Sequence, residues 1–224
     1  MDQKITALRA QKRNPERVNV YLDGEFAFGL ARIVAAWLTV GETLSQEKIV
    51  LLQAQDQVEV GLQHAIKYIG YRPRSVEEVR RNLVKNEYPE AAIEEVLDRL
   101  QRNGLLDDRK FARQWVENRL EFRPRGRRAL RFELRKAGIA DPIIQETLDD
   151  MLTNEGGLAY RAASKYARRL KTNERRVFFQ KLTGYLARRG FSYETAAAVV
   201  EQIWHEAESR SATAENNEFE NEVD

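Results

Sequence analysis

The chain lacks cysteine entirely and contains only two histidines, His64 and His205, among its 224 residues. The absence of cysteine excludes disulfides, cysteine-ligated zinc and thiol catalysis, and it is typical of proteins in a reducing compartment. Two histidines are too few for a histidine-rich metal site. We therefore expect no bound metal.

Long hydrophobic runs are missing as well. The most apolar segment, residues 33–40, is far shorter than the roughly 20 residues that a membrane-spanning helix needs. The first 20 residues hold no apolar stretch of the signal-peptide kind. We expect a soluble, cytoplasmic protein that does not contact a membrane.

Sequence signatures of catalysis are absent too. Neither GxGxxG nor GxxxxGKS/T, the glycine-rich patterns that hold phosphates, occurs in the chain. Of the two adjacent aspartate pairs, at 107–108 and 149–150, the first is better explained as a helix start, where negative charge is favourable. We expect a protein that is not an enzyme and that carries no cofactor.

The N-terminal segment has the pattern of a β-hairpin. Residues 17–30 alternate apolar and polar side chains on both sides of Asp23-Gly24, and Asp-Gly between two such runs is the strongest short-range hairpin signal. Residues 5–8 are predicted to add a third strand, and residues 30–38 to form a short helix. We expect Ser45 to cap the helix that follows.

From about residue 58 onward the apolar residues recur with the helical period of 3.6. Ser75 and Glu78 have the spacing of a capping box, in which each side chain takes an otherwise unpaired backbone N–H. Pro89 fits the first turn of the next helix, and Asn103-Gly104 ends that helix. Its apolar stripe consists of Ile93, Val96, Leu97 and Leu100.

The same apolar positions recur after 51 residues and again after about 52 more. The positions that align in this way are Leu83, Leu134 and Leu186; Ile93, Ile144 and Ala196; and Leu97, Leu148 and Val200. The chain therefore contains three copies of a three-helix unit. The third helix is predicted to be capped by Asp141, ahead of Pro142, in the second copy and by Ser192 in the third.

Two similar joints connect the first and second helices of the first two repeats. They are YRPRS at residues 71–75 and FRPRG at residues 122–126. We expect the aromatic residue of each joint, Tyr71 or Phe122, to pack against the core, and the proline to stop the preceding helix. The third repeat has no such joint, and its counterpart lies near residues 171–175.

These patterns predict a mainly α-helical fold, in which a small N-terminal domain with a β-hairpin precedes three tandem three-helix repeats in a curved, elongated array. The predicted boundaries are 1–57 for the N-terminal domain, 58–106, 107–153 and 154–208 for the repeats, and 209–224 for an acidic tail that we expect to be disordered. Trp115, Tyr166 and Trp204 occupy periodic positions and are predicted to be core residues.

Charge is distributed unevenly although the formal net charge is only +2. Basic residues dominate residues 123–136 and 161–189, whereas the helix at 89–100 and the C-terminal tail are acidic. Such runs are commonly no more than solvated helix faces. Here arginine dominates over lysine and the basic joints lie in loops, which favours a partner with an anionic surface, either nucleic acid or an acidic protein.

Three longer motifs resemble the RecX family of bacterial recombination regulators. They are the Arg-x-Arg-Ser joint at residues 72–75, the GLLDDRKFA step at residues 104–112, and a helix with the family's glycine, leucine and glutamate spacing. In that helix the matching residues are Gly126, Leu130, Glu133, Leu134, Gly138 and Ile139. The resemblance extends over about residues 5–206, and the first 30 residues resemble longer members with an additional N-terminal domain.

The resemblance implies a non-enzymatic regulator of homologous recombination and DNA repair, within the SOS response, that binds the filament of RecA on single-stranded DNA. Such proteins restrain RecA ATP hydrolysis and strand exchange. We expect a monomer whose basic second and third repeats meet either an acidic surface of RecA or the exposed backbone of the single-stranded DNA. From charge and loop placement, the predicted contact residues are Arg72, Arg74, Arg123, Arg125, Arg127, Arg128, Arg131, Arg168, Arg169, Arg175, Arg176, Arg188 and Arg189.

Two other functions remain open at the level of sequence. One is a DNA-binding protein of the helix-turn-helix type, which the three-helix units resemble. The last helix of each unit, where a recognition helix would lie, is however acidic or apolar. The other is a scaffold that binds a partner helix, for which no sequence feature identifies the partner.

Overall fold

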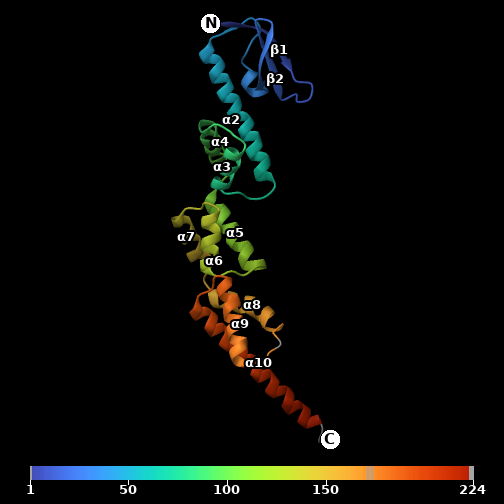
Figure 1. The fold of residues 1–224 in the computed structure, drawn as a ribbon, viewed down its shortest axis with the longest axis vertical. Coiled ribbons are helices and arrows are strands. Elements are labelled where there is room, and N and C mark those ends of the chain that lie inside the picture. Colours follow the sequence, from blue (N-terminus) through green and yellow to red (C-terminus); the bar gives the residue numbers. More distant parts are fainter. Residues whose placement is uncertain (1, 171, 173, 222–224) are drawn as a thin grey trace. The chain divides into compact units, whose positions relative to one another are not determined.

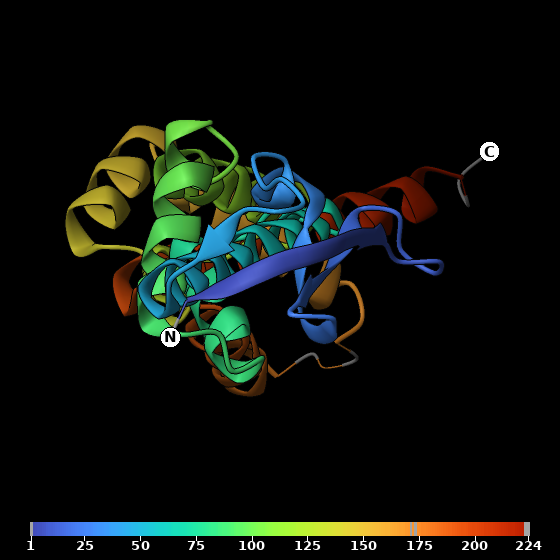
Figure 2. The ribbon, with the colours of Figure 1, turned by 90° about the horizontal axis from the view of Figure 1, so that it is seen from above.

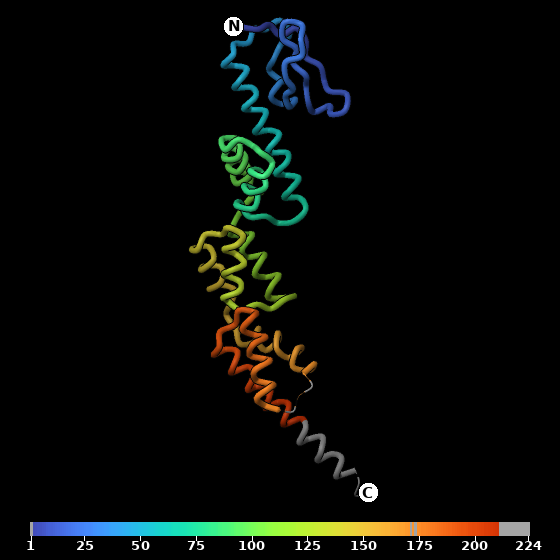
Figure 3. The backbone as a smooth tube through the Cα atoms, viewed as in Figure 1, coloured from blue at the N-terminus to red at the C-terminus, as the bar shows by residue number. Residues whose placement is uncertain are grey.

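The computed structural model describes residues 2–170, 172 and 174–221, with side chains described up to residue 210 (Figures 1 and 3). The chain forms two compact units, residues 1–107 and residues 108–224. The first unit contains a four-stranded sheet and the first three-helix repeat, and the second unit contains the other two repeats. The predicted mainly α-helical class with tandem three-helix repeats is confirmed.

The sheet of the first unit is antiparallel, with strand order β3-β2-β1-β4 (Figures 1 and 2). The strands are β1 (Gln3–Ala10), β2 (Arg17–Leu22), β3 (Glu25–Ala31) and β4 (Thr43–Leu44). The predicted hairpin is confirmed, because Asp23 and Gly24 connect β2 to β3 with φ of 49° and 94°. The predicted third strand is β1, whereas β4 was not predicted because two residues carry no period.

One face of the sheet covers a small core. Ile5, Val20 and Leu30 are completely buried there. They pack with Ile49 and Leu52 of the helix at residues 46–70. Helix α1 (Arg32–Ala35) is shorter than the predicted helix at 30–38. The alternation places Val20, Leu22 and Phe28 against this core as predicted, whereas Phe26, which was predicted to share a face with Phe28, is 58% exposed.

Helix α2 (Gln46–Gly70) extends from this core to the first repeat (Figure 1). Ser45 caps it as predicted, because its hydroxyl accepts a hydrogen bond of 3.2 Å from the Lys48 N–H. The predicted domain boundary at residue 57 falls inside α2, which packs on β3 through one part and on α4 through another. No proline interrupts the segment, so one helix runs through residue 58. The apolar pattern changes there because α2 packs on the sheet before this point and on α4 after it.

The first repeat is completed by α3 (Val76–Lys85) and α4 (Glu90–Arg102). The predicted capping box is present: the Glu78 N–H donates to the Ser75 hydroxyl at 3.1 Å, and the Ser75 N–H donates to the Glu78 carboxylate at 3.4 Å. Pro89 is the N-cap of α4 and lies one position before the helix. Helix α4 ends at Asn103-Gly104 as predicted, with Gly104 at a φ of 67°.

The second unit contains α5 (Asp108–Phe122), α6 (Arg127–Lys136), α7 (Asp141–Met151), α8 (Glu155–Ala167), α9 (Arg175–Arg188) and α10 (Tyr193–Asn221). One continuous core joins both of its repeats. The aligned positions Leu134, Leu186 and Ala196 are completely buried, which confirms the helical repeat. Trp115, Tyr166 and Trp204 pack against this core, as predicted.

The two predicted caps of the second unit have different outcomes. The Thr195 N–H donates to the Ser192 hydroxyl at 3.0 Å, so the Ser192 cap is confirmed. The Asp141 cap is wrong, because Ala140 is the N-cap and Asp141 is the first residue of α7. The Asp141 carboxylate is instead in a two-bond ion pair with Arg135, at 2.7 and 3.0 Å, and this hydrogen bonding lowers the pKa of Asp141.

The predicted burial of the joint aromatics is also wrong. Tyr71 is 74% exposed and Phe122 is 68% exposed. Each lies two residues beyond the last side chain of its helix that packs on a core, Ile69 or Leu120. Two residues correspond to a rotation of about 200° around an α-helix, so both aromatic rings point away from the core.

The predicted disordered tail begins at residue 209, but α10 continues to Asn221. Extending an existing helix requires no new nucleation, so α10 continues although residues 209–221 hold as many asparagines as glutamates. The rest of the predicted tail, residues 222–224, lies outside the described residues. Within the described part of the chain, no helix is long and apolar enough to cross a membrane.

Candidate functional site

The arginines of the first joint are engaged in contacts within the first unit. The Arg72 guanidinium donates to both carboxylate oxygens of Glu78, at 2.7 and 3.1 Å, and the hydrogen bond raises the pKa of Arg72. The Arg74 guanidinium lies 3.9 Å from the centre of the Tyr68 ring. Both predicted contact residues therefore stabilise the joint between α2 and α3.

Arg125 of the second joint has a similar role. Its Nε is buried and lies 3.8 Å from the Glu133 carboxylate. Glu133 also accepts hydrogen bonds of 2.8 Å from the Trp115 indole and from Arg119. Arg125 thus adds positive charge to a network that connects α5 with α6.

Three further predicted arginines pair with groups of neighbouring helices. Arg127 donates to Asp149 at 2.7 Å and to the Leu148 carbonyl at 3.1 Å, and its hydrogen bond lowers the pKa of Asp149. Arg131 donates to the Gln145 side chain, and Arg175 is in an ion pair with Glu201. These contacts connect α6 with α7 and α9 with α10.

The remaining predicted arginines have no ion pair with any described residue. Six of them are exposed: Arg123, Arg128, Arg168, Arg169, Arg176 and Arg188. Arg189 is half-buried, and its guanidinium lies 4.6 Å from the Tyr185 ring and donates to the Pro124 carbonyl at 3.3 Å. These side chains are the cations that remain available to an anionic partner.

Three of these cations meet in a groove of the second unit, which we call the basic groove. It has a volume of about 370 Å³ and lies between the end of α5, α8 and α9. Its lining residues are Phe122, Arg123, Pro124, Arg161, Ala162, Lys165, Tyr166, Arg169, Tyr185 and Arg189. The lining contains five cationic side chains and no carboxylate.

The sequence pattern missed two residues of the basic groove, Arg161 and Lys165. They follow one another at a spacing of four on α8, and Arg169 continues that spacing just beyond the helix. Residues four apart lie on the same helix face. The spacing by itself could have predicted a basic face on this helix, but only the fold shows that the second joint lies beside that face.

A close backbone approach positions the basic groove. The Gly126 N–H donates to the Arg189 carbonyl at 2.9 Å, and the Arg128 N–H donates to the Gly190 carbonyl at 3.2 Å. A Cβ atom on Gly126 would lie 2.4 Å from the Gly190 oxygen. The second joint is thereby held against the turn between α9 and α10, which places Arg123 in the same groove as Arg189.

A second cationic hollow, of about 360 Å³, lies along α6, and carboxylates offset part of its charge. It contains Arg127, Arg128, Arg131 and Arg135, with Glu155 and the exposed ring of Phe132. Arg127 and Arg135 are paired with aspartates, and Arg131 is bound to a glutamine side chain. Arg128 is its one cation without a side-chain partner among the described residues.

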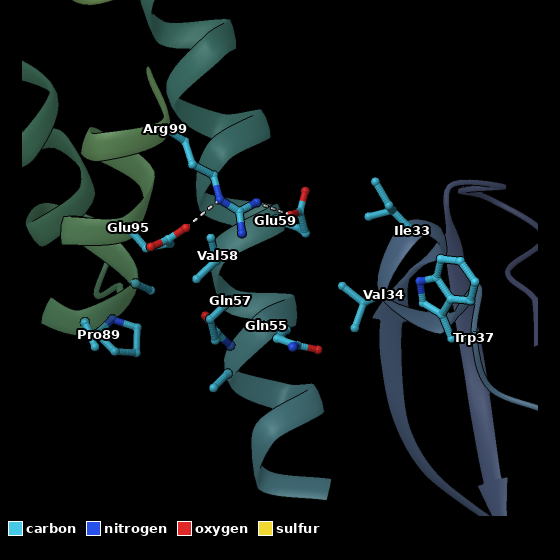
Figure 4. Close-up of a pocket in the computed structure, with 13 residues that line it drawn as sticks. Ile33, Val34, Trp37, Gln55, Gln57, Val58, Glu59, Pro89, Glu95 and Arg99 are labelled. Carbon is cyan, nitrogen blue, oxygen red and sulfur yellow. Dashed lines mark hydrogen bonds and ion pairs between the residues drawn. The ribbon is translucent and has the colours of Figure 1, made fainter. Parts of the chain in front are cut away.

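The first unit contains a hollow of a different character (Figure 4). It has a volume of about 500 Å³ and is lined mainly by apolar groups, among them Ile33 and Trp37 of the segment around α1 and Val58 of α2. Trp37 is 88% exposed. On one side, Arg99 connects Glu59 and Glu95 at 2.5 and 2.8 Å.

Within the described residues, no three histidine or carboxylate side chains are placed to hold a metal ion. The features with a chemical character suited to recognition are therefore the basic groove, the exposed arginines and the apolar hollow.

Comparison with known proteins identifies the family of the chain. Four family descriptions match in order along it: the regulatory protein RecX N-terminal domain at residues 3–45, and the first, second and third RecX three-helix domains at residues 62–100, 107–148 and 157–200. The three-helix matches fall on α2 to α4, α5 to α7 and α8 to α10, although the first begins inside α2 and the third ends inside α10.

Similar proteins are known from several bacteria. The regulatory protein RecX of Bacillus pumilus is 34% identical over 206 residues, which covers 89% of this chain and 77% of that protein. The regulatory protein RecX of Clostridium botulinum is 31% identical over 204 residues, covering 89% of this chain and 95% of that protein.

Solved structures of such proteins have the same fold. A crystal structure of a regulatory protein RecX superimposes with a TM-score of 0.72 at 29% identity, covering 91% of this chain and 99% of the other. RecX from Lactobacillus salivarius shares the fold with a TM-score of 0.60, over 66% of this chain. The chain therefore belongs to the RecX family of regulatory proteins.

Proposed function

We propose that this protein binds the filament that RecA forms on single-stranded DNA, and that it restrains RecA ATP hydrolysis and strand exchange. The observation that carries the proposal is the ordered match of all four RecX domains along the chain. The protein is then a non-enzymatic, cytoplasmic regulator of homologous recombination.

The structure narrows the set of arginines suited to contact the filament. Arg72 and Arg127 already pair with carboxylates of their own unit, and Arg125 shares Glu133 with Arg119, so these three arginines are less suited to a partner. We propose that the exposed arginines without an ion pair to described residues provide the contacts with RecA. Outside the basic groove these are Arg128, Arg168, Arg176 and Arg188.

The direct test is RecA ATP hydrolysis on single-stranded DNA, with this protein added below the RecA concentration. We expect the wild-type protein to lower the rate. The variant Arg128→Glu/Arg176→Glu/Arg188→Glu should require a concentration about tenfold higher for half inhibition, because three surface charge contacts of up to about 1 kcal/mol each are reversed.

A matched control reverses three exposed lysines of the first unit that also have no side-chain partner among the described residues: Lys12→Glu/Lys48→Glu/Lys85→Glu. It changes the net charge equally and should inhibit like the wild type. Reversal of Arg125 or Arg127 is a poorer test, because it would break ion pairs that hold the helices together. No change in the RecA rate up to equimolar wild-type protein would refute the proposal.

A DNA-binding protein of the helix-turn-helix type is the competing function. Helix α4, the last helix of the first repeat, carries Glu90, Glu94, Glu95 and Asp98. Arg80 of α3 holds Glu90 and Glu94 in ion pairs between helices, and Arg99 holds Glu95 within α4, so this acidic face is already paired. Such a surface is unsuited to the major groove of DNA.

A further inference from the structure

We infer that the basic groove is a binding site for the backbone of a single-stranded nucleic acid. The inference deepens the proposed function, on which it rests for its biological setting, because the filament contains single-stranded DNA. The binding itself is a property of this chain and is tested without RecA.

The charge of the basic groove is the first argument. Arg123, Arg161, Lys165, Arg169 and Arg189 line a hollow of about 370 Å³ that contains no carboxylate. None of the five forms an ion pair with a described residue, in contrast with the paired arginines of the cationic hollow along α6. Like charges gathered without counter-charges repel one another, and a row of phosphates removes that cost.

The second argument is that neutral acceptors fix two of these arginines in place. Arg161 donates to the Leu120 carbonyl at 2.6 Å and to the Glu121 carbonyl at 3.3 Å. Arg189 donates to the Pro124 carbonyl and lies over the Tyr185 ring. Carbonyl oxygens orient a guanidinium without cancelling its charge, so less side-chain freedom is lost when an anion binds.

The third argument is the presence of aromatic rings among the cations. Tyr166 and Tyr185 stack with their ring centres 4.3 Å apart and their planes 2° apart. Phe122, at the end of α5, lines the groove and is 68% exposed. A basic groove with an exposed ring is the arrangement that tracks a phosphate backbone while an unpaired base stacks on the ring.

These features favour a single strand over the two other anionic partners. The bases of a duplex are already stacked within it and offer no free face to Phe122. An acidic peptide would satisfy the cations but would cover the exposed ring only if it carried an aromatic side chain at the matching position. The groove therefore fits phosphates and an unpaired base better than carboxylates or duplex DNA.

The test uses the full-length protein and a fluorescently labelled 20-nucleotide thymidine oligonucleotide, with binding followed by fluorescence anisotropy across a salt series. The groove variant Arg123→Gln/Lys165→Gln/Arg169→Gln changes three exposed side chains that have no partner among the described residues. We expect binding at least tenfold weaker at about 0.1 M salt, and a log–log salt slope reduced by about 2, as expected for three lost phosphate contacts on a single strand.

Two further variants separate charge from stacking and from general electrostatics. Phe122→Ala should weaken binding roughly fivefold or more and leave the salt slope unchanged, because it removes a ring and no charge. Lys12→Gln/Lys48→Gln/Lys85→Gln removes the same charge from the first unit, away from the basic groove, and should bind like the wild type. Circular dichroism of each variant establishes that the helices are intact.

Several outcomes would overturn the inference. Equal weakening by the groove and control variants would mean that only net charge acts. Tighter binding of a 20-base-pair duplex, or displacement of the oligonucleotide by an equal charge of polyglutamate, would assign the groove to another partner. If the groove variant loses oligonucleotide binding while the wild-type protein leaves RecA unaffected, the groove assignment holds and the proposed RecA function fails. If the wild-type protein inhibits RecA but the groove variant binds the oligonucleotide as tightly as the wild type, the proposed function holds and the groove assignment fails.

Discussion

Gly126 occupies the position in the second joint that Ser75 occupies in the first. Ser75 has a buried side chain that caps α3, whereas Gly126 meets the Gly190 backbone so closely that a Cβ would lie 2.4 Å from its oxygen. The same point of two repeats is therefore used for a cap in one and for close backbone packing in the other.

Gly126→Ala is expected to lower the free energy of unfolding of the second unit by about 2–3 kcal/mol, because the backbone of Gly190 cannot yield as a flexible side chain does. The φ of Gly126 is −77°, which alanine adopts freely, so the cost is steric. Chemical denaturation followed by circular dichroism measures it.

Gly156→Ala is the control for this prediction in the same unit. Gly156 is exposed near the start of α8, and the nearest atom to an added Cβ is 3.8 Å away. Alanine there should be neutral or stabilising by up to about 1 kcal/mol, since it forms helix better than glycine. If both substitutions changed stability equally, the close approach at Gly126 would have no energetic consequence.

At the scale of elements, one buried carboxylate fastens the sheet to α2. Asp56 of α2 is 6% exposed. Its carboxylate accepts hydrogen bonds from both terminal nitrogens of Arg17 on β2, at 3.3 and 2.8 Å. It also accepts a hydrogen bond of 2.5 Å from the Ala31 N–H at the end of β3. Two strands and a helix thus meet at a single side chain.

Asp56→Ala is expected to destabilise the first unit by about 3 kcal/mol, because it leaves the Arg17 charge and the Ala31 N–H without their partner. Hydrogen exchange should become faster in β2 and β3, while α3 and α4 change less. Gln53→Ala, an exposed change on the same helix, should leave exchange unaltered. Uniformly faster exchange in both variants would show that Asp56 has no special role.

At the scale of the whole molecule, the hydrophobic cores follow the division into two units. Two clusters of buried side chains, one under the sheet and one in the first repeat, lie entirely within residues 1–107. The third cluster lies entirely within residues 108–224 and is shared by the second and third repeats.

A fragment of residues 1–107 is therefore expected to fold alone. Its circular dichroism spectrum should show helix, and it should unfold cooperatively in urea, because both of its cores are complete without the other unit. A control fragment of residues 1–57, which ends inside α2, should be far less stable. A fragment 1–107 without cooperative unfolding would contradict the division into units.

The sequence by itself determined the elements that depend on local pattern. The hairpin at Asp23-Gly24, the caps at Ser45, Ser75 and Ser192, and the three-helix repeat all follow from turn chemistry and from a period of 2 or 3.6. The family also follows from contiguous motifs, and the comparisons confirm it.

Only the tertiary structure decided which charges are free. Arg127 and Arg169 look alike in the sequence, yet one is paired with Asp149 and the other lines the basic groove without a carboxylate. The exposure of Phe122 likewise depends on how far α5 turns after its last core contact. A local pattern identifies the type of each side chain and its helix face, but ion pairs and grooves form between segments far apart in the sequence, and their distances are set by the packing of those segments.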